Sequence, residues 1–136
     1  MTMKRLLKIV PADPTPIWRQ IEDGIRRLVA SGALTPDDVL PSVRDLAKEL
    51  VVNPATVAKA YQRLADAGVV TVRRGEGTFV AARPPALGKA ELARILREAA
   101  GRYASVASTI GASSEEAIDA LRAVFSGYQR AAGGSR

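Results

Sequence analysis

The stretch LPSVRDLAKELVVNPATVAKAYQRLADAG, residues 40–68, carries two helix start signals in close succession. Ser42 can accept a hydrogen bond from the first helical turn, and Asp45 follows three residues later as an acidic version of the capping box. Asn53 and Pro54 repeat the signal, because Asn caps helices well and Pro at the first helical position lacks only an N–H that would stay unpaired. The sequence therefore predicts one helix after Ser42 and another after Asn53.

Apolar residues recur at helical spacing after each start signal. They are Val43, Leu46, Ala47 and Leu50 in the first run and Val57, Ala60, Tyr61 and Leu64 in the second. Gly68 ends the second run, since glycine is common just past a helix. Only Val51 and Val52 separate the two helices, which predicts a helix-turn-helix.

The neighbouring segments complete a winged helix. Apolar periodicity predicts a helix over residues 16–31 with Thr15 as its N-cap, whereas residues 33–41 contain two prolines and no usable period and are expected to form a loop. After the motif, VVTVR and TFVAA flank an Arg-Gly-Glu-Gly tip, which predicts a two-stranded hairpin. We therefore predict a mainly α fold with a small β wing, in the α+β class.

The sequence RPP at residues 83–85 predicts a domain boundary, with a winged helix-turn-helix in residues 1–83 and a two-helix dimerisation segment in residues 84–136. The first of these two helices carries an apolar seam with alternating steps of four and three, and the second carries an apolar stripe. The seam comprises Leu92, Leu96, Ala99, Tyr103, Val106 and Ile110, and the stripe comprises Ile118, Leu121, Phe125 and Tyr128.

The seam is expected to end at Gly111, with Ser113 or Ser114 capping the last helix. One short hairpin cannot bury so much apolar surface, so we interpret the seam and stripe as a homodimer interface. Two alternatives stay open. The helices could pack back on the winged helix, or a small-molecule effector could bind between them, although no ligand motif identifies one.

The composition limits what the chain does. Its 20 Lys and Arg against 14 Asp and Glu give a formal charge of +6 and a pI of about 10.2, which favours nucleic acid as the partner. Cysteine and histidine are absent, which excludes thiol nucleophiles, Ser-His pairs and Cys- or His-ligated metals. We expect no enzyme activity and no cofactor. No segment has the length and apolarity of a membrane span or signal peptide, so we expect a cytoplasmic protein without membrane contact.

The second helix of the motif has an outward face suited to the major groove of DNA. Small and cationic residues dominate this face, and the helix dipole favours phosphate at its N-terminus. The face carries Ala55, Thr56, Lys59, Gln62 and Arg63. The alternative is a solvated face whose cations serve only solubility.

Two residues of the preceding helix are further candidates. Arg44 can place its guanidinium on guanine or on a phosphate, or else form a local ion pair with Asp45 or Glu49. Ser42 can touch a phosphate, although capping its own helix is the simpler role.

The wing is predicted to contact the neighbouring groove. Arg73 and Arg74 supply cations, and Gly75 and Gly77 let the backbone approach DNA closely. Glu76 lies between the two glycines and opposes a purely electrostatic role, since it offsets one of the arginines.

Four segments, in this order and spacing, resemble the winged-helix domain of GntR-family bacterial transcription regulators: PIWRQIEDGIRRLVASGAL, LPSVRDLAKEL, VNPATVAKAYQRLADAGVV and RRGEGTFV. The resemblance covers about residues 5–82. Because only a short helical segment follows, the chain is most similar to the YtrA-like subfamily, whose helical tail dimerises. The resemblance implies a homodimeric regulator of double-stranded operator DNA, more often a repressor than an activator.

The resemblance also implies roles for single residues. Arg44 reads a base, the recognition helix is lined by Asn53, Ala55, Thr56 and Lys59, and the wing contact is Arg74-Gly75. A winged helix used for protein–protein contact, without specific DNA readout, is the alternative function.

Two positions depart from the family pattern, because Asp37 and Val51 stand where Gly is common. Valine is strained at a positive φ, so we expect the helix-helix turn to differ locally from that of the family.

Overall fold

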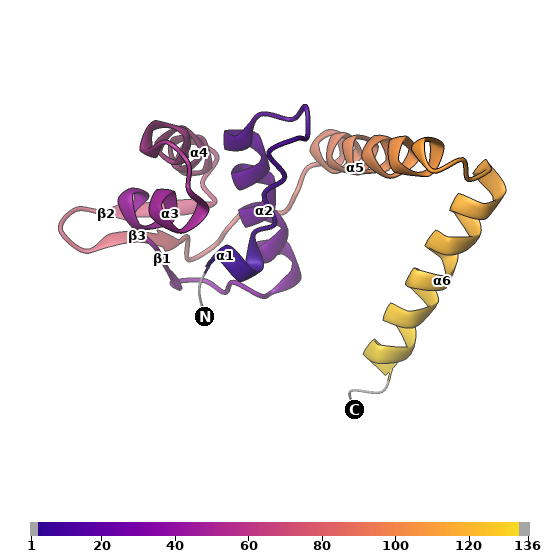
Figure 1. Ribbon diagram of the computed structural model, residues 1–136. Coiled ribbons are helices and arrows are strands. Elements are labelled where there is room, and N and C mark those ends of the chain that lie inside the picture. Colours follow the sequence, from indigo (N-terminus) through magenta and orange to yellow (C-terminus); the bar gives the residue numbers. More distant parts are fainter. Residues whose placement is uncertain (1–2, 134–136) are drawn as a thin grey trace. The chain divides into compact units, whose positions relative to one another are not determined.

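A computed structural model describes residues 3–133 of the chain. These residues fall into two compact units, Met1–Lys89 and Ala90–Arg136. The first unit holds four helices and three strands, and the second holds two helices (Figure 1). In the first unit the elements are α1 Met3–Leu6, α2 Ile17–Ser31, β1 Val39–Leu40, α3 Val43–Leu50, α4 Pro54–Asp66, β2 Val70–Arg73 and β3 Gly77–Val80.

The three strands form one antiparallel sheet in the order β1-β3-β2. Val39 of β1 pairs with Phe79 of β3, and on the other side of β3, Val70 of β2 pairs with Val80. The prediction that residues 33–41 form only a loop is therefore wrong at β1. Two residues are too short to show a period of two, so a strand of this length gives no pattern that sequence analysis could detect.

The core of the first unit lies between the helices and the sheet. Its fully buried side chains include Ile21 and Ile25 from α2, Leu46 from α3, and Val57 and Leu64 from α4. The apolar periodicity of the sequence thus marks the buried faces of all three helices.

Tyr61 adds a polar tie at the edge of this core. Its hydroxyl donates to the carbonyl oxygen of Pro41 at 2.7 Å, which joins α4 to the segment that leads into α3. Burial raises the pKa of the Tyr61 phenol, and the nearby Glu49 carboxylate raises it further. The phenol is therefore neutral at physiological pH and available as a donor.

The N-terminal residues contribute an element that the sequence analysis did not predict. Met3 in α1 and Leu7 just after it are buried in the core. Leu7 packs against Gly24, where an added Cβ would lie 2.5 Å from the Leu7 Cδ2 atom. Gly24 thus permits close approach of the N-terminal segment to α2.

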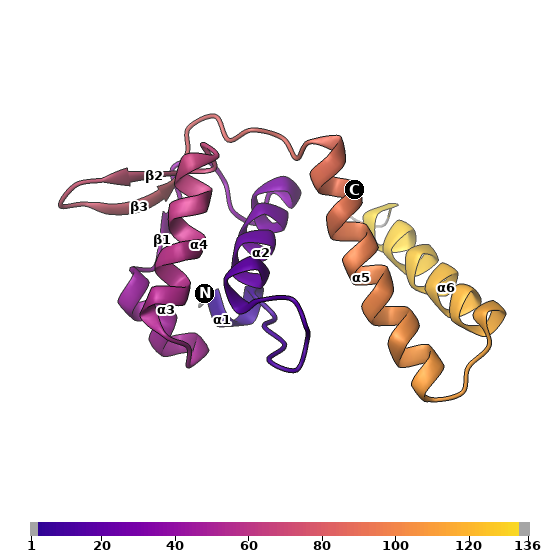
Figure 2. The same ribbon diagram turned by 90° about the horizontal axis from the view of Figure 1, so that it is seen from above.

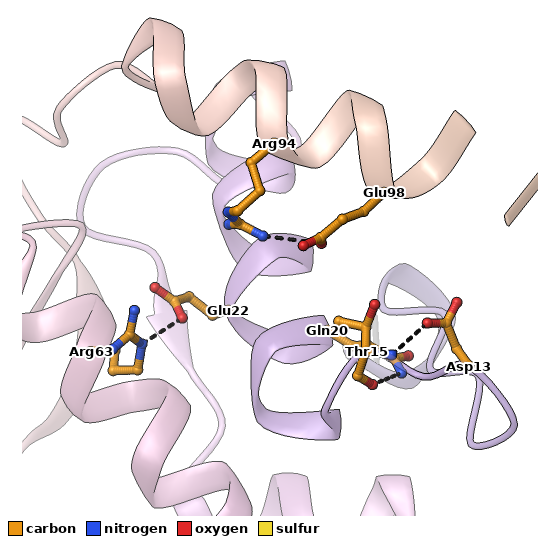
Figure 3. Close-up of polar contacts among 7 residues, drawn as sticks. All are labelled: Asp13, Thr15, Gln20, Glu22, Arg63, Arg94 and Glu98. Atoms are coloured by element: carbon orange, nitrogen blue, oxygen red, sulfur yellow. Dashed lines mark hydrogen bonds and ion pairs between the residues drawn. The ribbon is translucent and has the colours of Figure 1, made fainter. Parts of the chain in front are cut away.

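The predicted helix caps of the motif are confirmed. The Ser42 hydroxyl accepts from the Asp45 N–H at 3.0 Å, and Asn53 Oδ1 accepts from the Ala55 N–H at 2.9 Å. The predicted Thr15 cap is wrong. Helix α2 begins at Ile17 after Pro16. The Thr15 N–H instead donates to Asp13 Oδ1 at 2.8 Å, and the Thr15 carbonyl oxygen accepts from the Gln20 side-chain amide at 2.9 Å (Figure 3).

The local difference expected at the helix-helix turn does not occur. Val51 adopts the left-handed conformation itself, with φ of 56°, and Asp37 does the same with φ of 68°. The Val52 N–H then donates to the Ala47 carbonyl oxygen at 3.0 Å, as in a helix end normally closed by glycine. The side chain of Val51 is 85% exposed, so no packing of that side chain offsets the backbone strain.

The second unit comprises α5 Lys89–Thr109 and α6 Ser114–Gly133, two helices that are joined by a short turn and diverge from it (Figure 1 and Figure 2). We call this pair the helical hairpin. Gly111 lies in the turn with φ of 78°. The Tyr103 hydroxyl donates to the Ala117 carbonyl oxygen at 2.6 Å and so joins the two helices.

A capping box starts α6. The Glu116 N–H donates to the Ser113 hydroxyl at 3.1 Å, and the Ser113 N–H donates to Glu116 Oε1 at 3.0 Å. The bond from the Ser113 N–H lowers the pKa of the Glu116 carboxyl, and the Ser113 hydroxyl lowers it further. Of the two serines predicted as caps, Ser113 is the one that caps.

Candidate nucleic-acid interface

Arg44 lies in the first turn of α3 with an exposed side chain. It forms no hydrogen bond or ion pair with any residue in the range 3–133, so the local pair with Asp45 or Glu49 is not formed. All five guanidinium N–H donors are therefore available to an external acceptor.

The start of α4 is open to a ligand. Asn53 and Ala55 are exposed and Thr56 is half-buried, so only small side chains stand around the first turn. Asn53 Oδ1 accepts the Ala55 N–H in the cap. A helix start of this kind, with short side chains and a positive dipole end, admits close approach of a nucleic-acid strand.

Ser42 takes the simpler of its two predicted roles, since its hydroxyl caps α3. The hydroxyl hydrogen is not used in that bond, so a phosphate contact by Ser42 stays a prediction.

Lys59 and Arg63, further along α4, contact α2. The Lys59 ammonium lies 4.4 Å from the centre of the Trp18 ring, and the Arg63 guanidinium lies 4.8 Å from it. Arg63 also donates from Nε to Glu22 Oε2 at 2.8 Å, and this carboxylate is buried (Figure 3). Arg63, which is a predicted DNA contact, thus also joins α4 to α2.

The structure assigns different surroundings to the two wing arginines. Arg73 forms an ion pair with Asp37 Oδ1 at 2.7 Å, and its guanidinium lies 4.1 Å from the centre of the Phe79 ring. Arg74 is exposed and forms no hydrogen bond or ion pair within residues 3–133. Arg74 is therefore the freer of the two to meet DNA, and Arg73 ties the wing to the loop before β1.

The tip of the wing needs its glycines. Gly75 has φ of 79° and Gly77 has φ of 128°, both disfavoured for side chains with a Cβ. The Glu76 N–H donates to the Arg73 carbonyl oxygen at 2.9 Å and closes the turn. The tip thus presents backbone and Arg74 outward, as its sequence predicts.

Trp18 and Asp37 were not among the candidates from sequence, although both contact candidate cations. In the sequence, Trp18 is one more apolar residue at the start of a helix, and Asp37 is a residue of a loop. No spacing rule links either residue to its distant partner.

Some kinds of site are absent from the described residues. Within residues 3–133, no group of three or more acidic side chains is arranged to hold a metal ion. No helix in that same range is long and apolar enough to cross a membrane.

The helical hairpin exposes most of the apolar residues predicted to form the homodimer interface. Ala99 is half-buried, and the other nine are exposed. These nine are Leu92, Leu96, Tyr103, Val106, Ile110, Ile118, Leu121, Phe125 and Tyr128. A hollow of about 330 Å³ between α5 and α6 is lined mainly by small residues beside Tyr103, Ile118 and Leu121.

Comparison with known proteins identifies the family. Residues 18–80 match the model of the bacterial regulatory proteins of the gntR family. The chain is 31% identical over 112 residues to the HTH-type transcriptional regulator YhcF of Bacillus subtilis, covering 82% of this chain and 92% of that protein. The chain belongs to the GntR family. Its relatives are named as transcription regulators and not as enzymes.

A second relative is a named repressor. The chain is 41% identical over 75 residues to the HTH-type transcriptional repressor YtrA of Bacillus subtilis. This match covers 55% of the chain and spans 58% of the repressor's length.

Solved structures support the same family and fold. The GntR-family transcription factor YtrA from Sulfolobus acidocaldarius is 38% identical, with a TM-score of 0.56 over 70% of this chain and 96% of that one. The DNA-binding domain of AraR, solved in complex with operator ORX1, is 28% identical, with a TM-score of 0.51 over 55% of this chain and 96% of that one. This GntR-family regulator therefore has a winged helix-turn-helix of a kind that has been solved on operator DNA.

Proposed function

We propose that this GntR-family regulator binds a pseudo-palindromic operator as a homodimer and represses transcription. The observation that carries the sequence-specific part is the exposed guanidinium of Arg44, which has no internal partner in residues 3–133 and lies on α3, the helix that packs against α4. A guanidinium in this state can form two parallel hydrogen bonds to guanine O6 and N7.

The remaining candidates have roles that fit this arrangement. Asn53, Ala55 and Thr56 would line the groove at the start of α4, and Lys59 would attract phosphates. Arg74-Gly75 would meet the neighbouring groove, where an arginine is favoured by a narrow, A·T-rich minor groove. The AraR complexes with operator DNA support DNA as the partner of this fold.

The homodimer is supported by the exposed apolar face of the helical hairpin. An apolar surface of this kind is rare on a monomer and marks an interaction site. A two-fold dimer presents two copies of α4, and its symmetry requires a pseudo-palindromic operator. The repressor role is supported by the name of the YtrA relative.

The proposal requires no cofactor and no membrane contact, and it places the protein with DNA in the cytoplasm. The hollow between α5 and α6 could accept a small-molecule effector, although a second copy of the hairpin is an equally suitable occupant.

Selection from a random DNA pool with the purified protein tests the proposal. We expect a symmetric consensus made of two half-sites. A consensus without symmetry would contradict the homodimer, and no enrichment would favour the alternative of a protein-binding module. A steep fall in DNA affinity with added salt separates these functions too, because each neutralised phosphate contributes a slope of about −0.9 on a log-log plot.

A further inference from the structure

Trp18 is surrounded by three cationic side chains. The Lys59 ammonium lies 4.4 Å from the ring centre, the Arg63 guanidinium 4.8 Å and the Arg19 guanidinium 5.2 Å. We name these four residues the Trp18 cluster. All three distances fall within the range at which the face of an indole ring attracts a cation.

The cluster lies along the recognition helix α4, from Lys59 near its middle to Arg63 in its last turn. Trp18 in the first turn of α2 contacts Lys59, and Glu22, one turn later in α2, pairs with Arg63, one turn later in α4. The contacts advance in the same direction along both helices, so α2 and α4 run side by side with their N-termini at the same end (Figure 2). That end of α4 is the one proposed to enter the major groove.

The charge of the cluster is only partly balanced inside the protein. The buried Glu22 carboxylate accepts from Arg63 at 2.8 Å and lies 3.8 Å from Arg26. Lys59 forms no ion pair with any residue in the described range, and its side chain is exposed. The side chain of Arg63 is 49% exposed despite its ion pair. The unbalanced positive charge of this surface therefore favours an anionic partner.

We propose that Trp18 is a positioning residue, whose indole face holds Lys59 and Arg63 in place as a contact for the sugar–phosphate backbone of DNA beside the recognition helix. This inference rests on the proposed DNA-binding function. Long cationic side chains lose conformational entropy when they bind a phosphate, and a side chain already ordered on a ring loses less. Trp18 thus strengthens DNA binding without contacting a base.

The first test uses the unmodified protein, because Trp18 is the only tryptophan of the chain and is the source of its indole fluorescence. Iodide, an anion, should quench Trp18 more strongly than the cation caesium, since the cluster attracts anions. Saturation with a random-sequence DNA duplex should suppress the iodide quenching. The anisotropy of a dye on the same duplex reports binding independently.

Two outcomes of this test separate the inference from the proposed function. If anisotropy shows bound DNA while iodide quenching stays unchanged, the Trp18 cluster does not contact the backbone and the inference is wrong, although the protein still binds DNA. If the duplex does not bind at all, the proposed function fails and the inference fails with it.

The second test is a double-mutant cycle with Trp18→Leu and Lys59→Gln. Trp18→Leu keeps every charge, yet it should weaken binding to random-sequence DNA about 5-fold, because two ordered cations lose their ring. The same change should cost much less in the Lys59→Gln background. Trp18→Phe should restore part of the loss, since phenylalanine keeps a ring face.

A purely structural role for Trp18 predicts a different pattern. In that case Trp18→Leu would lower the melting temperature and weaken DNA binding equally with and without Lys59. This pattern, measured on variants that thermal unfolding shows to be folded, would overturn the proposal.

Discussion

The winged-helix unit and the helical hairpin differ in how far they bury their apolar side chains. The first unit buries Ile21, Ile25, Leu46 and Leu64 completely. The hairpin leaves Leu96 61% exposed, and Phe125 in its second helix is 57% exposed. Apolar burial is the main source of folding free energy, so the first unit has its own core, whereas the exposed apolar face of the hairpin supports the proposed homodimer.

The largest expected effect comes from a charge placed in the exposed apolar face of the hairpin. Leu96→Glu should dissociate the homodimer, because a symmetric interface would bury two unpaired carboxylates at roughly 3–5 kcal/mol each. Sedimentation velocity measures the result. Arg97→Glu is the matched control, since Arg97 is exposed and lies outside the apolar seam. A stable dimer in the Leu96→Glu variant would contradict this interface.

The next change tests the winged-helix side. Leu64→Ala should lower the free energy of unfolding by about 2–5 kcal/mol, because it leaves a cavity at a fully buried position. Chemical denaturation followed by circular dichroism measures the loss. The exposed Val72 on β2 offers a control, and Val72→Ala should change stability far less. Similar losses for both variants would mean that the core is not where the structure places it.

Arg44→Ala tests the DNA-facing surface. The variant should lose about 1–3 kcal/mol of binding free energy on the selected operator and little on random DNA, since the bonds to one base pair are lost. Titrations on both DNAs measure the difference. Equal losses on the two DNAs would assign Arg44 to a phosphate.

Val51→Gly tests the strained turn within the otherwise well-packed unit. The variant should be more stable by roughly 1 kcal/mol, since glycine adopts the left-handed conformation without strain while part of the gain is offset by its greater freedom in the unfolded chain. The half-buried Val52, which packs against the core, is the control, and Val52→Gly should destabilise. A less stable Val51→Gly variant would show that the turn carries no strain.

The smallest effect concerns the capping box of α6. The hydrogen bonds to Ser113 lower the folded-state pKa of Glu116, so their stabilisation is present above the unfolded-state pKa and is lost as pH falls through the folded value. Glu116→Gln, which removes the titrating carboxyl, should therefore reduce the acid sensitivity of the hairpin slightly. Helicity of α5 and α6 in paired acid titrations tests this, and identical titrations of wild type and variant would argue against the cap.

Sequence patterns predicted most of the fold because its main elements are long and periodic. Ser42 and Asn53 predicted the starts of α3 and α4, because their side chains cap the first turn of each helix. The apolar stripe of α4 predicted its buried face. Strand β1 was not predicted, because it is defined only by its pairing with β3, which lies far from it in the sequence.

The candidate site was predictable where position alone decides exposure. Arg44 and Arg74 follow from their places in α3 and in the wing. The difference between Arg73 and Arg74 depends on Asp37, and the surroundings of Lys59 depend on Trp18, which is 41 residues away along the chain. Tertiary contacts of this kind leave no mark in a single sequence.

The mass of the protein–operator complex tests the central claim most directly, namely that the hairpin joins two winged helices on one symmetric site. Sedimentation equilibrium on the selected operator should give two chains per duplex for the unmodified protein. The Leu96→Glu variant should bind the same duplex more weakly, by independent and unlinked occupation of its half-sites. A single chain bound at saturation, or two chains bound with undiminished affinity by Leu96→Glu, would contradict the account.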